Sequence, residues 1–170
     1  RGDVYHSDEN ASTATAIYRG NAGWQGRGTV AAAAELRWPF VGKAFGNGTQ
    51  ILTPRLQMVG TKTSGNLDVP NEDSRAVDLE DSNLFSLNRF PGYDRIENNF
   101  RMTYGLDWSV RGSKTSFDFN IGQSYRLSNQ AGIFPDGTGL SGKVSDIVGR
   151  SEFRFKDLVK LTHRFRLDKD

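Results

Sequence analysis

Apolar and polar side chains alternate along much of this 170-residue chain, and this period-two pattern constrains the fold more than any other feature. The clearest run is Phe100 to Val110, where every second residue is apolar and each residue between is polar or glycine. Because successive side chains of a strand point to opposite faces, the run predicts a strand with one apolar and one polar face. A polar stretch at 111–114 follows and the alternation then resumes at 117–126, which predicts a hairpin.

The same alternation recurs on both sides of this hairpin. It covers residues 29–40, 52–58, 148–156 and 159–167, and a weaker strand is expected from about Thr13 to Tyr18. Together these segments predict about seven meandering antiparallel strands, most of them near the ~9–11 residues that a tilted strand needs to cross a bilayer. Pro54 lies inside one segment, where a proline normally indicates an edge strand or a bulge.

Composition excludes several classes of protein without choosing among β-folds. Mean hydropathy is −0.58, and no run approaches the ~18 apolar residues of a membrane-spanning helix. Strands of a membrane barrel need only alternate side chains to be apolar, so this average does not exclude a barrel. The 22 basic and 20 acidic residues give a net charge of +2, too small to suggest nucleic acid as a partner. The absence of cysteine excludes disulfides and thiolate metal sites within this segment. The chain begins with Arg1 and ends in a charged run, so we expect it to be a piece of a longer protein.

The predicted connections differ in length in a regular order. Residues 111–114 and 156–158 form short turns, while longer connections are expected at 20–26, about 61–95 and about 127–143. Short periplasmic turns with longer extracellular loops are typical of outer-membrane barrels, whereas a soluble sandwich has no reason to keep that order. The sequence therefore predicts an all-β, antiparallel transmembrane β-barrel segment. Residues 1–170 would form part of one outer-membrane barrel domain, with extracellular loops at about 61–95 and 127–143.

The two faces of the predicted strands carry different side chains. Aromatic residues gather near the strand ends on the apolar parity, as in the girdles at membrane interfaces. We expect these residues to face lipid: Trp38, Phe40, Phe100, Trp108, Phe117, Phe119, Phe153 and Phe155. Charged residues on the other parity are expected to line a wet lumen, because charge facing hydrocarbon costs ~2–4 kcal/mol at the midplane. They are Arg101, Asp107, Asp118, Arg126, Arg150, Glu152, Arg154, Lys160 and Arg164. The basic ones either attract phosphates or pair with carboxylates on adjacent strands.

No catalytic, cofactor or metal site is predicted. Ser151 and His163 share the apolar parity, but no nucleophile motif surrounds them, and His163 is better explained by an interface or a bulge. The long loop carries six acidic residues that fit either a solvated loop or a divalent-cation site: Asp68, Glu72, Asp73, Asp78, Glu80 and Asp81.

The long loop also carries motifs that point to a family. They are Asn71-Glu72-Asp73-Ser74, Asp81-Ser82-Asn83-Leu84-Phe85 and Arg89-Phe90-Pro91-Gly92-Tyr93-Asp94-Arg95-Ile96-Glu97. With Leu52–Leu56 and Thr162–Lys169, they resemble the barrel domain of the LptD family, the lipopolysaccharide-assembly proteins of the outer membrane, in its alphaproteobacterial form. The resemblance covers most of the chain and corresponds to a later portion of the barrel. Its most specific part is the loop motif of Arg89, Gly92, Tyr93, Asp94 and Arg95.

This resemblance implies a non-catalytic protein, integral to the bacterial outer membrane, that inserts lipopolysaccharide into the outer leaflet. The implied partners are lipopolysaccharide, outer-membrane lipid, an LptE-like lipoprotein plug, and a periplasmic LptA-type bridge reached through a domain outside this chain. Asp94 and Arg95 either stabilise a turn or fold into the barrel mouth, where they affect lipid release or plug docking. The alternatives are another outer-membrane barrel, such as a porin or adhesin, and a soluble β-sandwich interaction module.

Overall fold

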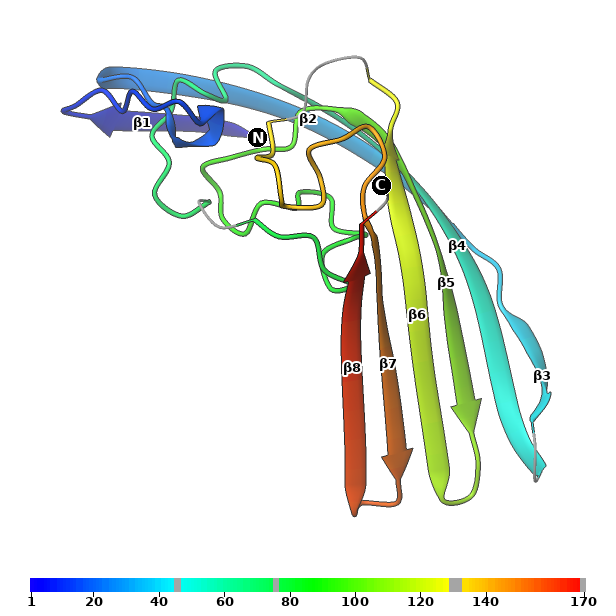
Figure 1. Ribbon diagram of the computed structural model, residues 1–170. Helices are drawn as coiled ribbons and strands as arrows, with labels where there is room; N and C mark the ends of the chain where they lie inside the picture. Colours follow the sequence, from blue (N-terminus) through cyan, green and yellow to red (C-terminus); the bar gives the residue numbers. More distant parts are fainter. Residues whose placement is uncertain (45–46, 75–76, 129–132, 169–170) are drawn as a thin grey trace.

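The computed structural model describes residues 1–44, 47–74, 77–128 and 133–168. Within these ranges the chain forms one antiparallel sheet (Figure 1), with a strand order of β1-β2-β4-β5-β6-β7-β8 and with β3 also paired to β4. The strands are β1 (Gly2–Ser7), β2 (Gly23–Arg37), β3 (Phe40–Ala44), β4 (Gly48–Thr63), β5 (Phe100–Arg111), β6 (Thr115–Arg126), β7 (Ile147–Phe155) and β8 (Val159–Leu167). The all-β antiparallel prediction is confirmed. A sandwich needs a second sheet, and the described residues form only one.

The N-terminal part differs from the prediction. The strand expected from Thr13 to Tyr18 is wrong, because a short 3-10 helix, η1 (Ala16–Tyr18), occupies its end and Ile17 is buried there. β1 lies in residues that the alternation analysis left unassigned, and it takes the place of the strand at 13–18 in the count. The described strands number eight rather than about seven because the run at 29–40 forms two of them. β2 begins at Gly23, inside the connection expected at 20–26. The run at 29–40 is divided between β2 and β3.

The break between β2 and β3 explains how a proline, Pro54, fits inside β4. The backbone N–H of Trp38 donates to the carbonyl oxygen of Pro54 at 3.1 Å. In an antiparallel strand the N–H and C=O of one residue point to the same neighbour, so the nitrogen of Pro54 also points toward the gap between Arg37 and Phe40. A proline is tolerated there because the neighbouring strand is interrupted where the missing N–H would bond.

The strand register places alternating residues on opposite faces of the sheet. Directly opposite residues share a face, and the pairings join Phe40, Leu52, Trp108, Phe119, Ser151 and His163 in one row. The adjacent row, on the other face, joins Thr53, Asp107, Asn120, Arg150 and Arg164. We call these the apolar face and the polar face.

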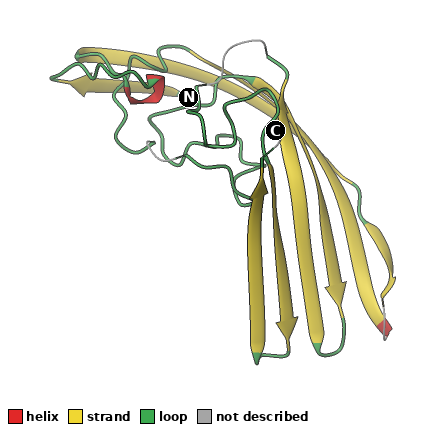
Figure 2. Cartoon of the chain, in the orientation of Figure 1, coloured by secondary structure: helices red, strands yellow, loops and turns green. Residues whose placement is uncertain are grey.

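The long connections lie at the strand ends opposite the short turns. β5 and β6 are joined by residues 112–114 and β7 and β8 by 156–158, whereas 64–99 and 127–146 are long. These long segments fold under the bent sheet (Figures 1 and 2). The hydrophobic core is built there, mostly from loop side chains: Ile17, Val77, Leu79, Leu84, Phe90, Phe134, Leu140 and the strand residue Val148. None of the described helices has the length and apolar character needed to cross a membrane.

Candidate functional site

The long loops cover one end of the polar face, and we call residues 64–74, 77–99 and 133–146 the loop cap. Besides the apolar packing around Val148, polar contacts join it to the strands. The Gln57 side chain donates to the carbonyl oxygen of Phe85 at 3.0 Å, and the Arg55 guanidinium lies 3.8 Å from the centre of the Phe85 ring. Arg164 of β8 lies 3.4 Å from the Asp81 carboxylate. The cap is therefore attached across the sheet from β4 to β8.

Asp73 and Asp94 hold the motif turn together by reciprocal bonds. The Asp73 carboxylate accepts the backbone N–H groups of Tyr93 at 2.8 Å and Asp94 at 3.0 Å, and the Asp94 carboxylate accepts that of Glu72 at 2.8 Å. Partial burial raises the pKa of Asp73, but the N–H groups of Tyr93 and Asp94 outweigh this and lower it to about 2. A Cβ at Gly92 would lie 2.2 Å from the Asp73 carboxyl carbon, so this position requires glycine.

Arg95 is fully buried and binds backbone carbonyl groups. Its guanidinium donates to Ile17 and Val69 at 2.9 Å each, and also to Arg19. The Asn88 side chain, in turn, donates to the Arg95 carbonyl oxygen at 2.9 Å. Because buried charge is costly unless fully hydrogen-bonded, this arrangement fixes the segment around η1 against the loop cap.

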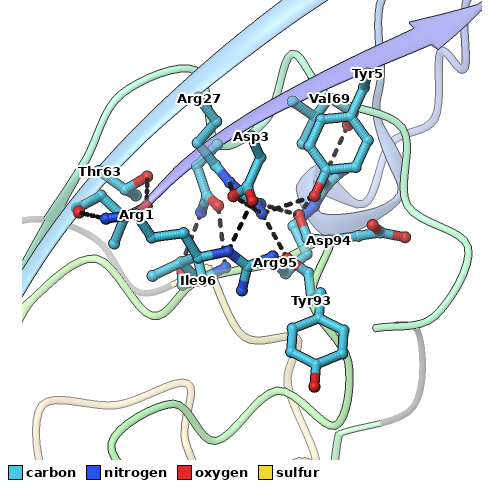
Figure 3. A network of polar contacts seen from close by, with 12 residues as sticks. Arg1, Asp3, Tyr5, Arg27, Thr63, Val69, Tyr93, Asp94, Arg95 and Ile96 are labelled. Atoms are coloured by element: carbon cyan, nitrogen blue, oxygen red, sulfur yellow. Dashed lines mark hydrogen bonds and ion pairs between the residues drawn. The ribbon is translucent and has the colours of Figure 1, made fainter.

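Arg27 of β2 connects the strands to the same turn (Figure 3). Its buried side chain lies 2.9 Å from the Asp3 carboxylate and donates to the Tyr5 hydroxyl at 2.8 Å, both on β1. It also donates to the carbonyl oxygens of Tyr93 and Asp94 at 2.6 Å each. Asp94 thus accepts backbone N–H groups, as expected of it in a turn. Arg95 was expected to pair with a lumenal carboxylate in that turn, and instead it binds backbone carbonyl groups. An effect on lipid release or plug docking stays a prediction.

A buried cluster at Glu97 fastens the cap to β5. The carboxylate accepts two bonds from Arg89, one of them at 2.7 Å, and lies 3.3 Å from Arg101. Asn99 donates to it at 2.8 Å, and Glu97 is 1% exposed. Burial raises the pKa of Glu97, but the attraction of Arg89 and Arg101 outweighs this and leaves it below its ordinary value.

The rest of the polar face carries ion pairs between strands and is left uncovered by the cap in Figure 1. Arg55 lies 3.4 Å from Asp107 and Arg111 lies 2.6 Å from Asp118. Glu152 pairs with Arg150, Arg154 and Lys160. A hollow of about 320 Å³ opens among six of the side chains of this face: Asp107, Ser109, Asp118, Asn120, Arg150 and Glu152. Of the basic residues expected to line the lumen, Lys160 pairs with Glu152 across adjacent strands, and Arg150 and Arg154 pair with it within β7. The other two carboxylates expected as their partners, Asp107 and Asp118, pair instead with Arg55 and Arg111.

Seven of the eight residues predicted to face lipid lie on the apolar face, as their register shows, whereas Trp38 lies between β2 and β3 and outside the paired registers. Five of the eight are exposed, from Trp38 at 61% to Phe155 at 37%, whereas Trp108, Phe117 and Phe119 are half-buried. Trp108 and Phe117 contact edge to face, with ring centres 5.6 Å apart. That this face meets lipid, and the opposite face water, stays a prediction.

The other candidate residues form no site. Ser151 and His163 are opposite each other in an unbroken ladder, so the bulge explanation for His163 is wrong. Among the hydrogen bonds of the described residues none joins them, and His163 stacks on Phe165 at 5.9 Å. The six acidic loop residues do not gather, since the described ranges contain no group of three or more potential metal ligands. Sequence reasoning missed Arg27 and Asp3, which no motif distinguishes.

Comparison with known proteins identifies the family. The model of the family described as "LptD: LPS transport system D" matches residues 1–170. Curated relatives include the LPS-assembly proteins LptD of Cupriavidus pinatubonensis, 34% identical over 58% of this chain, and of Cupriavidus necator, 30% identical over 73%. That of Polaromonas sp. is 29% identical over 64%. The chain spans only 13–14% of the length of these relatives. Because the family match covers every residue, this chain belongs to the LptD family.

Proposed function

We propose that this chain forms part of the wall of one outer-membrane β-barrel domain that delivers lipopolysaccharide to the outer leaflet. The observation that carries the proposal is the two-faced single sheet. Its apolar face is exposed over several strands, while its other face holds ion pairs and a loop cap. In water such an exposed apolar surface favours aggregation, whereas contact with acyl chains stabilises the fold.

The arrangement of the loops supports an orientation. Long loops are extracellular in outer-membrane barrels, so the loop cap would close the lumen near the cell exterior and the turns at 112–114 and 156–158 would face the periplasm. The aromatic side chains of Phe153 and Phe155, next to one of these turns, would then lie at the periplasmic interface.

The proposed cargo is lipopolysaccharide, as the names of the curated relatives state for those proteins. The uncovered polar face supplies charged and amide groups that hydrate sugars and phosphates, while acyl chains would leave sideways into the bilayer. The chain would act without catalysis. Its proposed partners are an LptE-like lipoprotein plug, and an LptA-type periplasmic bridge that reaches the protein through a domain outside this chain.

Photocrosslinking in living cells tests this function. A photoreactive amino acid replaces Asn120, which lines the polar hollow, in the full-length protein. The matched control is Phe119, the adjacent residue on the apolar face. We expect adducts with lipopolysaccharide sugars at Asn120 and adducts with membrane acyl chains at Phe119. An assembled protein that gives no lipopolysaccharide adduct at Asn120 or at the neighbouring hollow residues would contradict the proposal. Co-purification with a lipoprotein plug tests the partner separately.

A further inference from the structure

Two arginines and Lys143 line a small cavity beside the loop cap with a single carboxylate, and a third arginine lies behind that carboxylate. Arg89 and Glu97 of the cap and Arg126 of β6 line the cavity, and Arg101 joins the cluster through its contact with Glu97. The side chains of Arg89, Arg101 and Glu97 are each at most 4% exposed. The cluster thus carries an excess of positive charge in a place shielded from solvent.

Several donors in this cluster have nothing to bond. Among the described residues, no partner is found for Nη1 of Arg89, Nε of Arg101 or Nε of Arg126, although all three atoms are buried. Both oxygens of Glu97 are already engaged by Arg89, and Asn99 adds a further bond. Unsatisfied buried donors are rare in proteins and indicate an ordered water or ion, and an unbalanced buried charge costs several kcal/mol.

The cavity limits what can occupy it. Its volume is about 10 Å³, which is room for one particle of about the size of a water molecule. Phosphate and sulfate are too large, and a cation would be repelled by the guanidinium groups of Arg89 and Arg126 that line the cavity and by Arg101 nearby. Ser124 and Ser145 also line the space, but their hydroxyl groups already donate to the carbonyl oxygens of Met102 and Asp146, so the donors left for an anion are those of the arginines.

We infer that this cavity binds a single monatomic anion, chloride under physiological conditions, that locks the loop cap to the sheet. The anion would contact Arg89 from the segment 64–99 and Arg126 from β6. It would also lie beside Ser145 from the segment 127–146, so it would join both halves of the cap to the barrel wall. The site is independent of the proposed transport function.

Halide dependence of stability tests the inference on the purified full-length protein. Thermal unfolding is followed while sodium chloride replaces sodium gluconate at constant ionic strength. We expect Tm to rise with chloride and to saturate in the wild type, and Arg126→Gln to abolish the rise. Arg154→Gln is the control, because Arg154 pairs with Glu152 and does not line the cavity; it should keep the rise. No chloride-specific rise in the wild type, or an equal rise in Arg126→Gln, would overturn the inference.

Anomalous diffraction from wild-type crystals grown in bromide gives a second measurement that needs no variant. We expect one bromine peak between the side chains of Arg89 and Arg126. A cavity that shows no anomalous peak, or only an ordered water, would overturn the inference even if the Arg126→Gln protein fails to fold.

Discussion

Replacing Glu97 with glutamine is expected to release the loop cap from β5. The change keeps the shape of the side chain but removes the charge that compensates Arg89 and Arg101, and both guanidinium groups stay buried. Removing one partner of a buried pair costs ~3–5 kcal/mol. Because two arginines share this carboxylate, we expect its removal to make docking of the cap onto β5 less favourable by the same ~3–5 kcal/mol.

Hydrogen exchange on the full-length protein measures the effect. Cap amides at 64–74 and 77–99 should exchange about two to three orders of magnitude faster in Glu97→Gln, since each ~1.4 kcal/mol is a factor of ten. The control is Asp118→Asn, which also removes the carboxylate partner of an arginine. In this pair the side chains are exposed, Asp118 at 41% and Arg111 at 53%. Such pairs contribute ~0–1 kcal/mol, so exchange of the cap should hardly change. A change of less than tenfold in Glu97→Gln would refute the claim that this cluster fastens the cap.

Three further predictions address the motif turn and the sheet. Gly92→Ala should displace Asp73 and weaken the two charge-assisted bonds that its carboxylate accepts, at a cost of ~2–4 kcal/mol. The loop should then be cleaved faster by trypsin, and a loop as resistant as that of the wild type would contradict the role of Asp73 in holding the motif turn. Because the folded-state pKa of Asp73 lies below its unfolded value of ~3.9, its contribution is present above about pH 4 and is lost as pH falls toward 2. Protection of the cap amides, measured relative to their intrinsic exchange rate at each pH, should therefore fall over that acid range in the wild type, and Asp73→Asn should lack this step. Pro54→Ala should change the free energy of unfolding by less than ~1 kcal/mol, whereas Leu56→Pro, with paired neighbours on both sides, should cost ~3 kcal/mol or more in urea unfolding.

The regular strands were predictable because their pattern is local. In the hairpins β5–β6 and β7–β8 the alternation is nearly regular and the turn is short, so sequence spacing determines the pairing within each hairpin. The pairing of β6 with β7 spans the long segment 127–146, and no such spacing determines it. β1 has no such run: its residues include Gly2, Asp3 and His6, and its pairing with β2 joins residues 16 to 26 positions apart. The break between β2 and β3 was not predictable either, because apolar and polar residues continue to alternate from Arg37 to Phe40.

The loop cap was beyond prediction for a different reason. Arg95 binds backbone carbonyl groups, which every residue carries, so no side-chain pattern marks its partners. Asp73 and Asp94 are 21 positions apart, and in sequence a cluster of acidic residues indicates a cation site as readily as carboxylates that accept backbone N–H groups. The family resemblance located the motif, but its role required the folded geometry.

Solvent and oxygen accessibility along β5 tests the central claim most directly. Single spin labels are placed at successive positions from 106 to 109 in the full-length protein reconstituted in lipid, since this segment contains no native cysteine. We predict that Leu106 and Trp108 are accessible to oxygen dissolved in the bilayer, whereas Asp107 and Ser109 are accessible to a water-soluble paramagnetic reagent. Loss of this alternation, or the opposite phase, would contradict the assignment of the apolar face to lipid and the polar face to a wet lumen.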